Sequence, residues 1–228
     1  MTSIKSREAL AVKYRPQTLA ELIGQAGLVN TLNGHLKKGT LPRSLLITGS
    51  TGCGKTTVAR ILAHYVNCDR FDFEKLVPCF ACEYCLAVAK KRYPDVDELN
   101  FSDDRGIDAV RQLIASAEYA SNFNARVFIL DEIQSATKAA QNALLKLLEE
   151  PPEGVYLILL TTDPHRLLPT VKNRCLPLHV ERVAEDAPPP KQRTVLVDLN
   201  AMQNKSAKEL IEFAQDNEIE LDGKTYGP

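Results

Sequence analysis

A stretch of eight residues has the side-chain types and the spacing needed to hold phosphate. Gly49-Ser50-Thr51-Gly52-Cys53-Gly54-Lys55-Thr56 matches the pattern G-x-x-x-x-G-K-[ST] at every position. The glycines allow successive backbone N–H groups to curl around an anion at a helix N-terminus, where the helix dipole adds partial positive charge. Lys55 would then reach the β and γ phosphates of ATP, and the Thr56 hydroxyl would bind Mg²⁺. The predicted nucleotide contacts here are Gly49, Gly52, Cys53, Gly54, Lys55, Thr56 and Thr57.

The residues on either side of this stretch supply the strand and the helix that the motif requires. Residues 44–48 form a short apolar run of the buried-strand type, and apolar residues recur at helical spacing over 58–63. The alternative is a glycine-rich turn that binds no ligand. The complete match in a strand–loop–helix context favours a phosphate-binding loop.

An acidic pair follows a second apolar strand. Residues 126–132 read Arg-Val-Phe-Ile-Leu-Asp-Glu, which is a Walker B pattern. A strand parallel to the first would bring Asp131 beside the phosphate loop to hold Mg²⁺ through water, and Glu132 could polarise an attacking water. Taken in isolation, these residues could be a strand that ends in two solvated acids. Beside an intact phosphate loop they predict nucleotide hydrolysis.

Four of the six cysteines lie within 18 residues, at positions 68, 79, 82 and 85. Zn²⁺ prefers four soft, deprotonated ligands at tetrahedral corners, and gaps of two residues let neighbouring thiolates turn toward one ion. The spacing differs from that of a common zinc ribbon, and unconnected buried cysteines are the alternative. We predict a structural Zn²⁺ bound by Cys68, Cys79, Cys82 and Cys85. Cys53 and Cys175 lie far from this group and are interpreted as ordinary thiols.

Length and composition limit the class of protein. The 228 residues suffice for one large α/β domain and a small appendage, and 28 basic residues against 29 acidic ones restrict any nucleic-acid contact to a local patch. The sequence has no run of 18 apolar residues, and residues 1–14 lack the apolar core of a signal peptide. These features predict a cytoplasmic protein with no membrane contact, in which the cysteines are thiols or metal ligands.

The hydrophobic pattern predicts a fold of alternating strands and helices. The expected strands are residues 44–48, 97–101, 126–132, 155–160 and 176–180, with the fourth central and the proline-containing fifth at an edge. Thr18 and Glu21 have the spacing of a capping box at the start of a short helix, and Asp103 or Asp104 can cap the helix over 107–117. Another helix is expected over 137–150, where Pro151-Pro152 ends it. Residues 181–194 are interpreted as a proline-rich linker, and 195–228 as a small tail with a helix at 206–216.

Several segments together carry a resemblance to a known family. They are the phosphate loop, the cysteine group, Val12-Lys13-Tyr14-Arg15-Pro16-Gln17-Thr18, Asn142-Ala143-Leu144-Leu145-Lys146, Leu148-Glu149-Glu150-Pro151-Pro152-Glu153, Thr161-Thr162-Asp163-Pro164 and Asn173-Arg174-Cys175. With them the chain resembles the bacterial clamp-loader gamma/tau subunit of DNA polymerase III over about residues 10–180. Other AAA+ ATPases share the phosphate loop, but not the zinc-binding cysteines alongside the Glu-Glu-Pro-Pro-Glu segment.

The resemblance implies a fold, an activity and partners. The fold would be an AAA+ P-loop NTPase with a parallel five-stranded sheet, a zinc-binding insertion at 68–85 and a small helical C-terminal tail, the ATPase domain covering residues 1–180. The chain would bind ATP, Mg²⁺ and Zn²⁺ and, in a hetero-oligomer with other clamp-loader subunits, open a sliding clamp and load it onto primer–template DNA.

The resemblance also implies roles for individual residues. Thr162 corresponds to the sensor of the γ-phosphate, and Arg174 to an arginine finger acting on the ATP of a neighbouring subunit. The segment that includes Val12, Tyr14, Arg15 and Pro16 corresponds to the adenine contact. Together with Lys55, Asp131 and Glu132, Thr162 and Arg174 complete the predicted catalytic set.

The sequence also departs from the family pattern. Asn173 stands where the finger motif has serine, and residues 181–228 contain no Gly-Ser-x-Arg-Asp-Ala segment typical of the helical lid. We therefore expect both lid and collar to be absent, as in a phage-encoded, split or truncated form. An alternative function follows from this expectation, namely a non-catalytic nucleotide-binding adaptor or competitor within the same assembly.

Overall fold

The fold is taken from a computed structural model, which describes residues 15–102, 106–183, 220–221 and 224–225. The predicted helix at 206–216 and residues 184–194 of the predicted linker lie outside the described residues. Within the described part of the tail, β6 (Glu220–Leu221) and β7 (Lys224–Thr225) form an antiparallel pair.

Five parallel strands form one sheet in the order β2-β3-β4-β1-β5. The strands are β1 (Ser44–Thr48), β2 (Val96–Asn100), β3 (Arg126–Asp131), β4 (Val155–Thr161) and β5 (Leu176–His179). All five coincide with predicted strands to within one or two residues. The predicted parallel five-stranded sheet is confirmed, and β4 is central as predicted. Pro177 sits on β5 at the sheet edge, where a residue without an N–H leaves the ladder intact.

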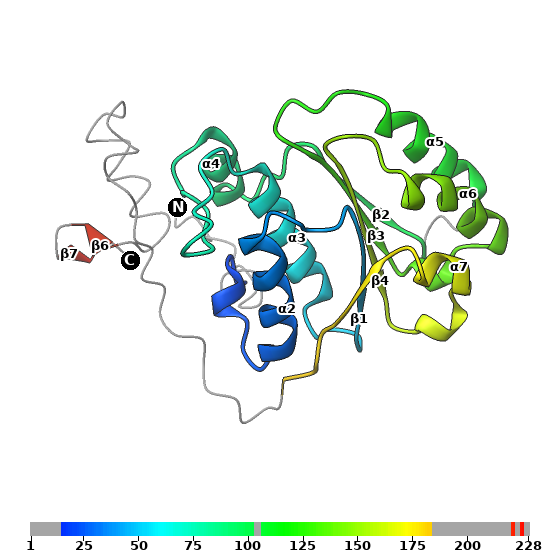
Figure 1. The fold of residues 1–228 in the computed structure, drawn as a ribbon, viewed down its shortest axis with the longest axis horizontal. Coiled ribbons are helices and arrows are strands. Elements are labelled where there is room, and N and C mark those ends of the chain that lie inside the picture. Colours follow the sequence, from blue (N-terminus) through cyan, green and yellow to red (C-terminus); the bar gives the residue numbers. More distant parts are fainter. Residues whose placement is uncertain (1–14, 103–105, 184–219, 222–223, 226–228) are drawn as a thin grey trace, which may run out of the picture.

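Helices cover both faces of the sheet, because strands buried on two sides need apolar partners above and below (Figure 1). On one side lie α2 (Ala26–Lys37), α3 (Lys55–Asn67) and α4 (Glu83–Ala89). On the other lie α5 (Ile107–Ala117), α6 (Lys138–Glu149) and the short α7 (Pro169–Lys172). Single turns of 3₁₀ helix occur at η1 (Leu19–Glu21), η2 (Ile133–Ser135) and η3 (Pro164–Arg166).

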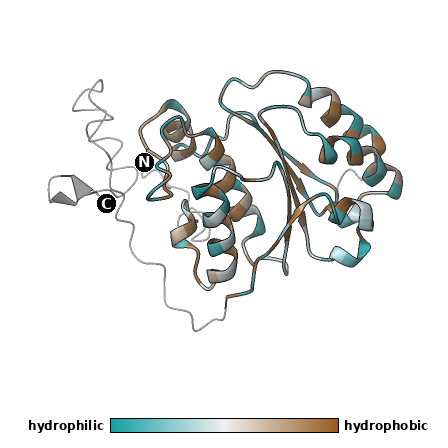
Figure 2. Cartoon of the chain, in the orientation of Figure 1, coloured by the Kyte–Doolittle hydropathy of each residue, from teal (hydrophilic) through white to brown (hydrophobic). Residues whose placement is uncertain are grey.

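The alternation of side chains along β1 divides the core into two clusters. Leu45 and Ile47 pack with α2 and α3, whereas Leu46 packs with α5 and α6 on the opposite face. The central strands β1, β3 and β4 are accordingly mostly apolar, whereas the edge strand β2 carries acidic residues and is partly exposed. The helices are apolar on the inner side and polar on the outer side (Figure 2). The sheet is thus fixed from both faces, and its carboxyl-terminal edge becomes a rigid base for the loops that leave it.

Helix starts match the predictions in part. Thr137 caps α6 by accepting a hydrogen bond from the N–H of Ala140. The predicted capping box at Thr18 does not form, because Glu21 instead accepts from the Thr18 hydroxyl and from the N–H of Gln17. Helix α5 begins after Gly106, and Asp103 and Asp104 lie outside the described residues.

Within the described residues, no helix is both long and apolar enough to cross a membrane.

Candidate functional site

The predicted phosphate loop connects the end of β1 to the start of α3. Gly54 has φ +106° and Gly52 φ +78°, backbone conformations that strain any residue with a Cβ. A Cβ on Gly49 would lie 2.4 Å from the carbonyl oxygen of Val180 and 2.7 Å from the Cys53 sulfur. The loop is therefore held close to the segment after β5, and its glycines are required by the local geometry.

Lys55 and Thr56 begin α3, the helix that follows the loop. The Lys55 side chain is buried, and its ammonium donates to the carbonyl oxygens of Gly49 and Ser50 at 3.0 Å each. The Thr56 hydroxyl donates to Asp131 at the end of β3, with 3.3 Å between Oγ1 and Oδ2. The two sequence motifs therefore meet, although 75 positions separate these residues. A hydroxyl and a carboxylate oxygen side by side are ligands that suit Mg²⁺.

Glu132 lies at the sharp turn after β3. Its backbone is in the left-handed region, at φ 53° and ψ 38°. The Thr162 hydroxyl, just beyond the end of β4, lies 3.4 Å from Glu132 Oε2. The structure thus brings together Asp131, Glu132 and Thr162 at the carboxyl ends of neighbouring parallel strands, which is where α/β folds bind ligands.

A buried glutamine that the sequence analysis did not single out links these groups. Gln134 donates from its side-chain nitrogen to the Glu132 carboxylate and to Thr162 Oγ1, the second at 2.9 Å. Its side-chain oxygen accepts from the hydroxyl of Thr161 at 2.6 Å. Because a carboxylate accepts only, the amide orientation is determined by these partners. No motif or spacing rule marks this position, so only the fold reveals it.

Of the predicted adenine segment, Val12 and Tyr14 lie outside the described residues. Arg15 and Pro16 are partly buried, and with Gln17 they line a small pocket against α3 and the segment after α4. The other residues lining that pocket are Arg60, Ile61, His64, Val88 and Tyr93. Next to it, the N–H of Leu19 donates to the Tyr65 hydroxyl at 2.9 Å. The N-terminal segment is therefore fastened to α3.

Arg174 lies between α7 and β5, and its partners are on α6 and α7. Its guanidinium donates to the Glu149 carboxylate from Nε at 3.1 Å and from Nη2 at 3.0 Å, and to the Thr170 carbonyl oxygen from Nη1 at 3.0 Å. The Arg174 side chain is 30% exposed and that of Glu149 is 59% exposed. In the described part of the chain, these hydrogen bonds leave Arg174 at the surface and join it to no phosphate-loop residue.

The four predicted zinc ligands converge. Their Sγ atoms all lie within 4.8 Å of one another, and Cys85 Sγ is 3.7 Å from Cys68 Sγ and 3.8 Å from Cys79 Sγ. Four sulfurs at about 2.3 Å from a tetrahedral zinc ion would be about 3.8 Å apart. The donor set and spacing therefore fit Zn²⁺. Among the described residues, Cys53 and Cys175 are not part of this cluster.

Polar contacts within the cysteine cluster favour the thiolate at Cys79 and Cys82. The N–H of Cys79 donates to Cys68 Sγ at 3.2 Å, and the N–H of Cys82 donates to Cys79 Sγ at 3.3 Å. Hydrogen bonding with neighbouring thiols, Cys68 foremost, lowers the pKa of Cys79 well below its usual range and that of Cys82 to about 6. Hydrogen bonding within the same cluster raises the pKa of Cys68 and of Cys85. Nε2 of His64 lies 3.1 Å from Cys85 Sγ, and burial lowers the pKa of this imidazole to about 4.

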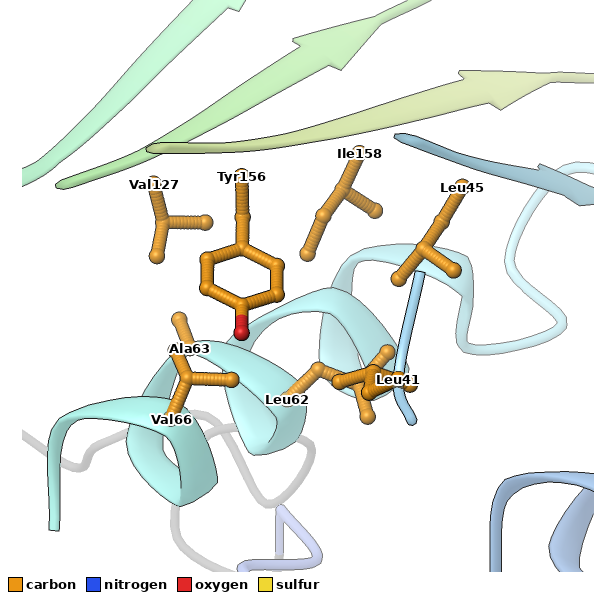
Figure 3. Close-up of a pocket in the computed structure, with 8 residues that line it drawn as sticks. All are labelled: Leu41, Leu45, Leu62, Ala63, Val66, Val127, Tyr156 and Ile158. Atoms are coloured by element: carbon orange, nitrogen blue, oxygen red, sulfur yellow. The ribbon is translucent and has the colours of Figure 1, made fainter. Parts of the chain in front are cut away.

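A second small pocket is part of the core and not a ligand site. Figure 3 shows that it lies between the sheet and α3, and that its walls are aliphatic apart from the Tyr156 ring. The lining residues are Leu41, Leu45, Leu62, Ala63, Val66, Val127, Tyr156 and Ile158. No charged side chain faces it, so it has nothing with which to bind phosphate.

Comparison with known proteins identifies the family. A family model described as DNA polymerase III, delta subunit, matches residues 24–184, which is more than half of the chain. The chain belongs to this DNA polymerase III family. Together with the parallel sheet and the phosphate loop between β1 and α3, membership confirms the predicted P-loop AAA+ fold.

Individual relatives within this polymerase III group carry gamma or tau names. The chain is 36% identical to the DNA polymerase III subunit tau of Escherichia coli over 77% of its own length, and 41% identical to the subunit gamma/tau of Mycobacterium tuberculosis over 73%. It covers 27% and 29% of those two proteins, so it spans less than a third of their length. A solved gamma subunit-related protein from Thermotoga maritima is 28% identical over 69% of this chain and 47% of that chain, with a TM-score of 0.49. The predicted resemblance to gamma/tau subunits is confirmed.

Proposed function

We propose that this polymerase III relative is an ATP-binding and ATP-hydrolysing subunit of a clamp loader. It would work in a hetero-oligomer with other clamp-loader subunits, open a sliding clamp and load it onto primer–template DNA. Support comes from the gamma and tau names of its relatives and from the residues at the carboxyl edge of the sheet. The observation that carries the proposal is the contact of Thr56 with Asp131, because it joins the phosphate loop to the Walker B strand.

The chain's own groups account for binding of the nucleotide. Lys55 donates to two loop carbonyls at 3.0 Å, so its ammonium is already within the loop and can exchange those acceptors for phosphate oxygens. Thr56 and Asp131 would hold Mg²⁺, which neutralises charge on the β and γ phosphates. The segment at Arg15 and Pro16, which packs against α3, would contact the base.

Hydrolysis requires a positioned water and stabilised charge. Glu132 would accept a hydrogen bond from the water and orient it toward the γ-phosphate. The Thr162 hydroxyl, held by Gln134 beside Glu132, would contact the γ-phosphate and would lose this contact after hydrolysis. This arrangement needs no covalent intermediate, since phosphoryl transfer depends mainly on positioning and electrostatics.

Two further roles belong to the proposal. Arg174 would act in trans, because its guanidinium is partly exposed and its hydrogen bonds are to Glu149 on α6 and Thr170 on α7 and not to the chain's own loop. Its charge would stabilise the transferring phosphoryl group of a neighbour.

The four cysteines would hold one structural Zn²⁺, since four thiolates leave no open position for a substrate or water.

The test is ATP turnover in the native assembly. The chain is recovered from its native cell with whatever co-purifies, and hydrolysis is measured with and without sliding clamp and primed DNA. Stimulation by clamp plus primed DNA is the expected result. Nucleotide binding without turnover under every condition would instead favour the non-catalytic adaptor. Failure to bind nucleotide would overturn both readings.

A further inference from the structure

A buried histidine connects the cysteine cluster to the helix that begins at the phosphate loop. His64 lies on α3, is 1% exposed, and its Nε2 is 3.1 Å from the Sγ of Cys85, 21 residues further along the chain. Cys85 belongs to α4, so this contact joins two helices. His64 is not among the candidate residues of the sequence, because nothing in its spacing to the cysteines matches a common metal motif.

The chemistry of a zinc thiolate defines what this contact is. Four thiolates around Zn²⁺ carry a net charge of −2, and burial makes donors to the sulfurs valuable. Backbone N–H groups serve Cys68 and Cys79, as described above. For Cys85, the group within hydrogen-bond distance from outside the cluster is the His64 imidazole, whose Nε2 donates or accepts according to its tautomer. A zinc-bound thiolate has no proton and can only accept, so the ring must carry its proton on Nε2.

The surroundings of His64 include the N-terminal segment that is predicted to contact adenine. His64 lines the pocket that Arg15, Pro16 and Gln17 also line, and the adjacent Tyr65 accepts the hydrogen bond from Leu19. The last turns of α3 therefore contact both the cysteine cluster and the N-terminal segment. Lys55 and Thr56 lie at the other end of the same helix.

We infer that His64 is an outer-sphere partner of the zinc centre: its Nε2–H donates to the Cys85 thiolate and fixes the cysteine cluster to α3. The inference rests on the zinc binding in the proposed function. A purely structural role would need only the ring, which packs against Phe80 and Tyr84 with centroids 6.0 Å and 6.2 Å away. Ring packing and hydrogen bonding are separable, because phenylalanine keeps the first and removes the second.

The test compares metal binding in His64→Phe, His64→Gln and wild type. Dissociation constants for zinc are measured by chelator competition, and cobalt-substituted protein reports the thiolate-to-metal charge-transfer bands. We expect His64→Phe to weaken zinc binding about 10- to 100-fold and to shift the bands, as loss of an outer-sphere partner does in other metal sites. His64→Gln, which keeps an N–H donor, should lie closer to wild type. Tyr84→Phe is the matched control and should leave both readouts unchanged, since the buried Tyr84 hydroxyl beside the cluster has no hydrogen-bond partner among the described residues.

A measurement on the unaltered chain completes the test. In zinc-loaded protein with ¹⁵N-labelled histidine, the His64 proton should be found on Nε2 by NMR, where it exchanges slowly with solvent. A proton on Nδ1 alone would overturn the inference, and this result does not depend on any variant folding. Wild-type zinc affinity and cobalt spectra in His64→Phe would also overturn it. Wild type without metal at the cysteines would overturn the proposed zinc site together with this inference.

Discussion

The Thr56 hydroxyl at the start of α3 donates a hydrogen bond to the Asp131 carboxylate at the end of β3, across 3.3 Å. Strand β4 lies between β1 and β3 in the sheet, so the contact spans the central strand at its carboxyl end. Parallel strands of similar length bring their ends to one edge, which is why two motifs 75 residues apart in sequence can share a cation.

Replacing Asp131 should remove the dependence of nucleotide binding on Mg²⁺. Asp131→Asn keeps the shape of the side chain and loses its charge, so we expect ATP to bind about tenfold more weakly with Mg²⁺ and almost equally without it. Titration calorimetry in the presence of Mg²⁺ or EDTA measures both. Thr56→Ser, which retains the hydroxyl, should behave as wild type. Full Mg²⁺ dependence in Asp131→Asn would exclude the proposed cation site.

Lys55 and Glu132 should affect different steps. Lys55→Ala removes the charged donor to the phosphates, and we expect ATP affinity to fall on the order of a hundredfold. Glu132→Gln keeps the side-chain shape, so binding should persist while turnover falls about 10²- to 10⁴-fold, as expected for loss of a general base. A fluorescent ATP analogue measures binding, and phosphate release measures turnover. Equal loss of affinity in both variants would contradict the assignment.

Gln134 should matter for turnover and not for binding. Gln134→Leu removes the amide that holds the Glu132 carboxylate and Thr162 Oγ1, so we expect kcat to fall about 10- to 100-fold with little change in KM, as misplacement of catalytic groups does.

Gln141→Leu is the matched control for that variant. Gln141 is also a buried glutamine, and its amide bonds the Ala136 carbonyl and the Leu168 N–H, away from Glu132. Its replacement should lower the melting temperature and leave kcat unchanged. If both variants lose turnover in proportion to their loss of stability, Gln134 has no positioning role.

The sequence was sufficient to predict the five strands, because β1, β3 and β4 are short, mostly apolar runs and turn signals separate the elements. The sequence also predicted that the four cysteines form one cluster, since their spacing limits the sulfurs to a small volume. The sequence analysis did not identify Gln134 or His64, because packing of separate elements brings Thr161 and Thr162 to Gln134 and Cys85 to His64. Burial of Gln134 is a property of the fold, so no signal in the sequence marked this residue.

The capping box at Thr18 is a different case. The spacing of Thr18 and Glu21 was right, but Glu21 instead accepts hydrogen bonds from the Thr18 hydroxyl and the Gln17 N–H, because η1 is a single 3₁₀ turn. The pairing of Arg174 with Glu149 could not be predicted either. It depends on how α6 and α7 pack, which neither motif encodes.

Removing zinc should destabilise the chain, because the cluster joins the end of α3 to the start of α4. Elemental analysis of protein purified without added metal should find about one zinc per chain, and chelation should lower the melting temperature. Cys82→Ser should have the same effect. Cys175→Ser is the control, since Cys175 is buried outside the cluster and burial raises its thiol pKa to about 12. Melting that is indifferent to chelator and to added zinc would refute the structural site.

Arg174 should be required by a neighbour's active site and not by its own. The guanidinium is held at the surface by Glu149 and by the Thr170 carbonyl, and its hydrogen bonds join it to none of the described residues of the chain's own phosphate loop. Arg174→Ala should therefore spare ATP binding and lower turnover about 10³- to 10⁵-fold in the assembled complex, as loss of an arginine finger does.

Mixing experiments separate action in trans from action in cis. Subunits with Arg174→Ala and subunits with Lys55→Ala are each inactive by different defects, and a mixture forms some composite sites in which an intact loop meets an intact finger. Partial recovery of turnover is expected. Glu149→Gln keeps a hydrogen-bond acceptor for Arg174 but removes the charge that holds it, so it should reduce turnover far less than Arg174→Ala. A mixture without recovery, in an assembly where wild type is active, would mean that Arg174 serves its own subunit or none.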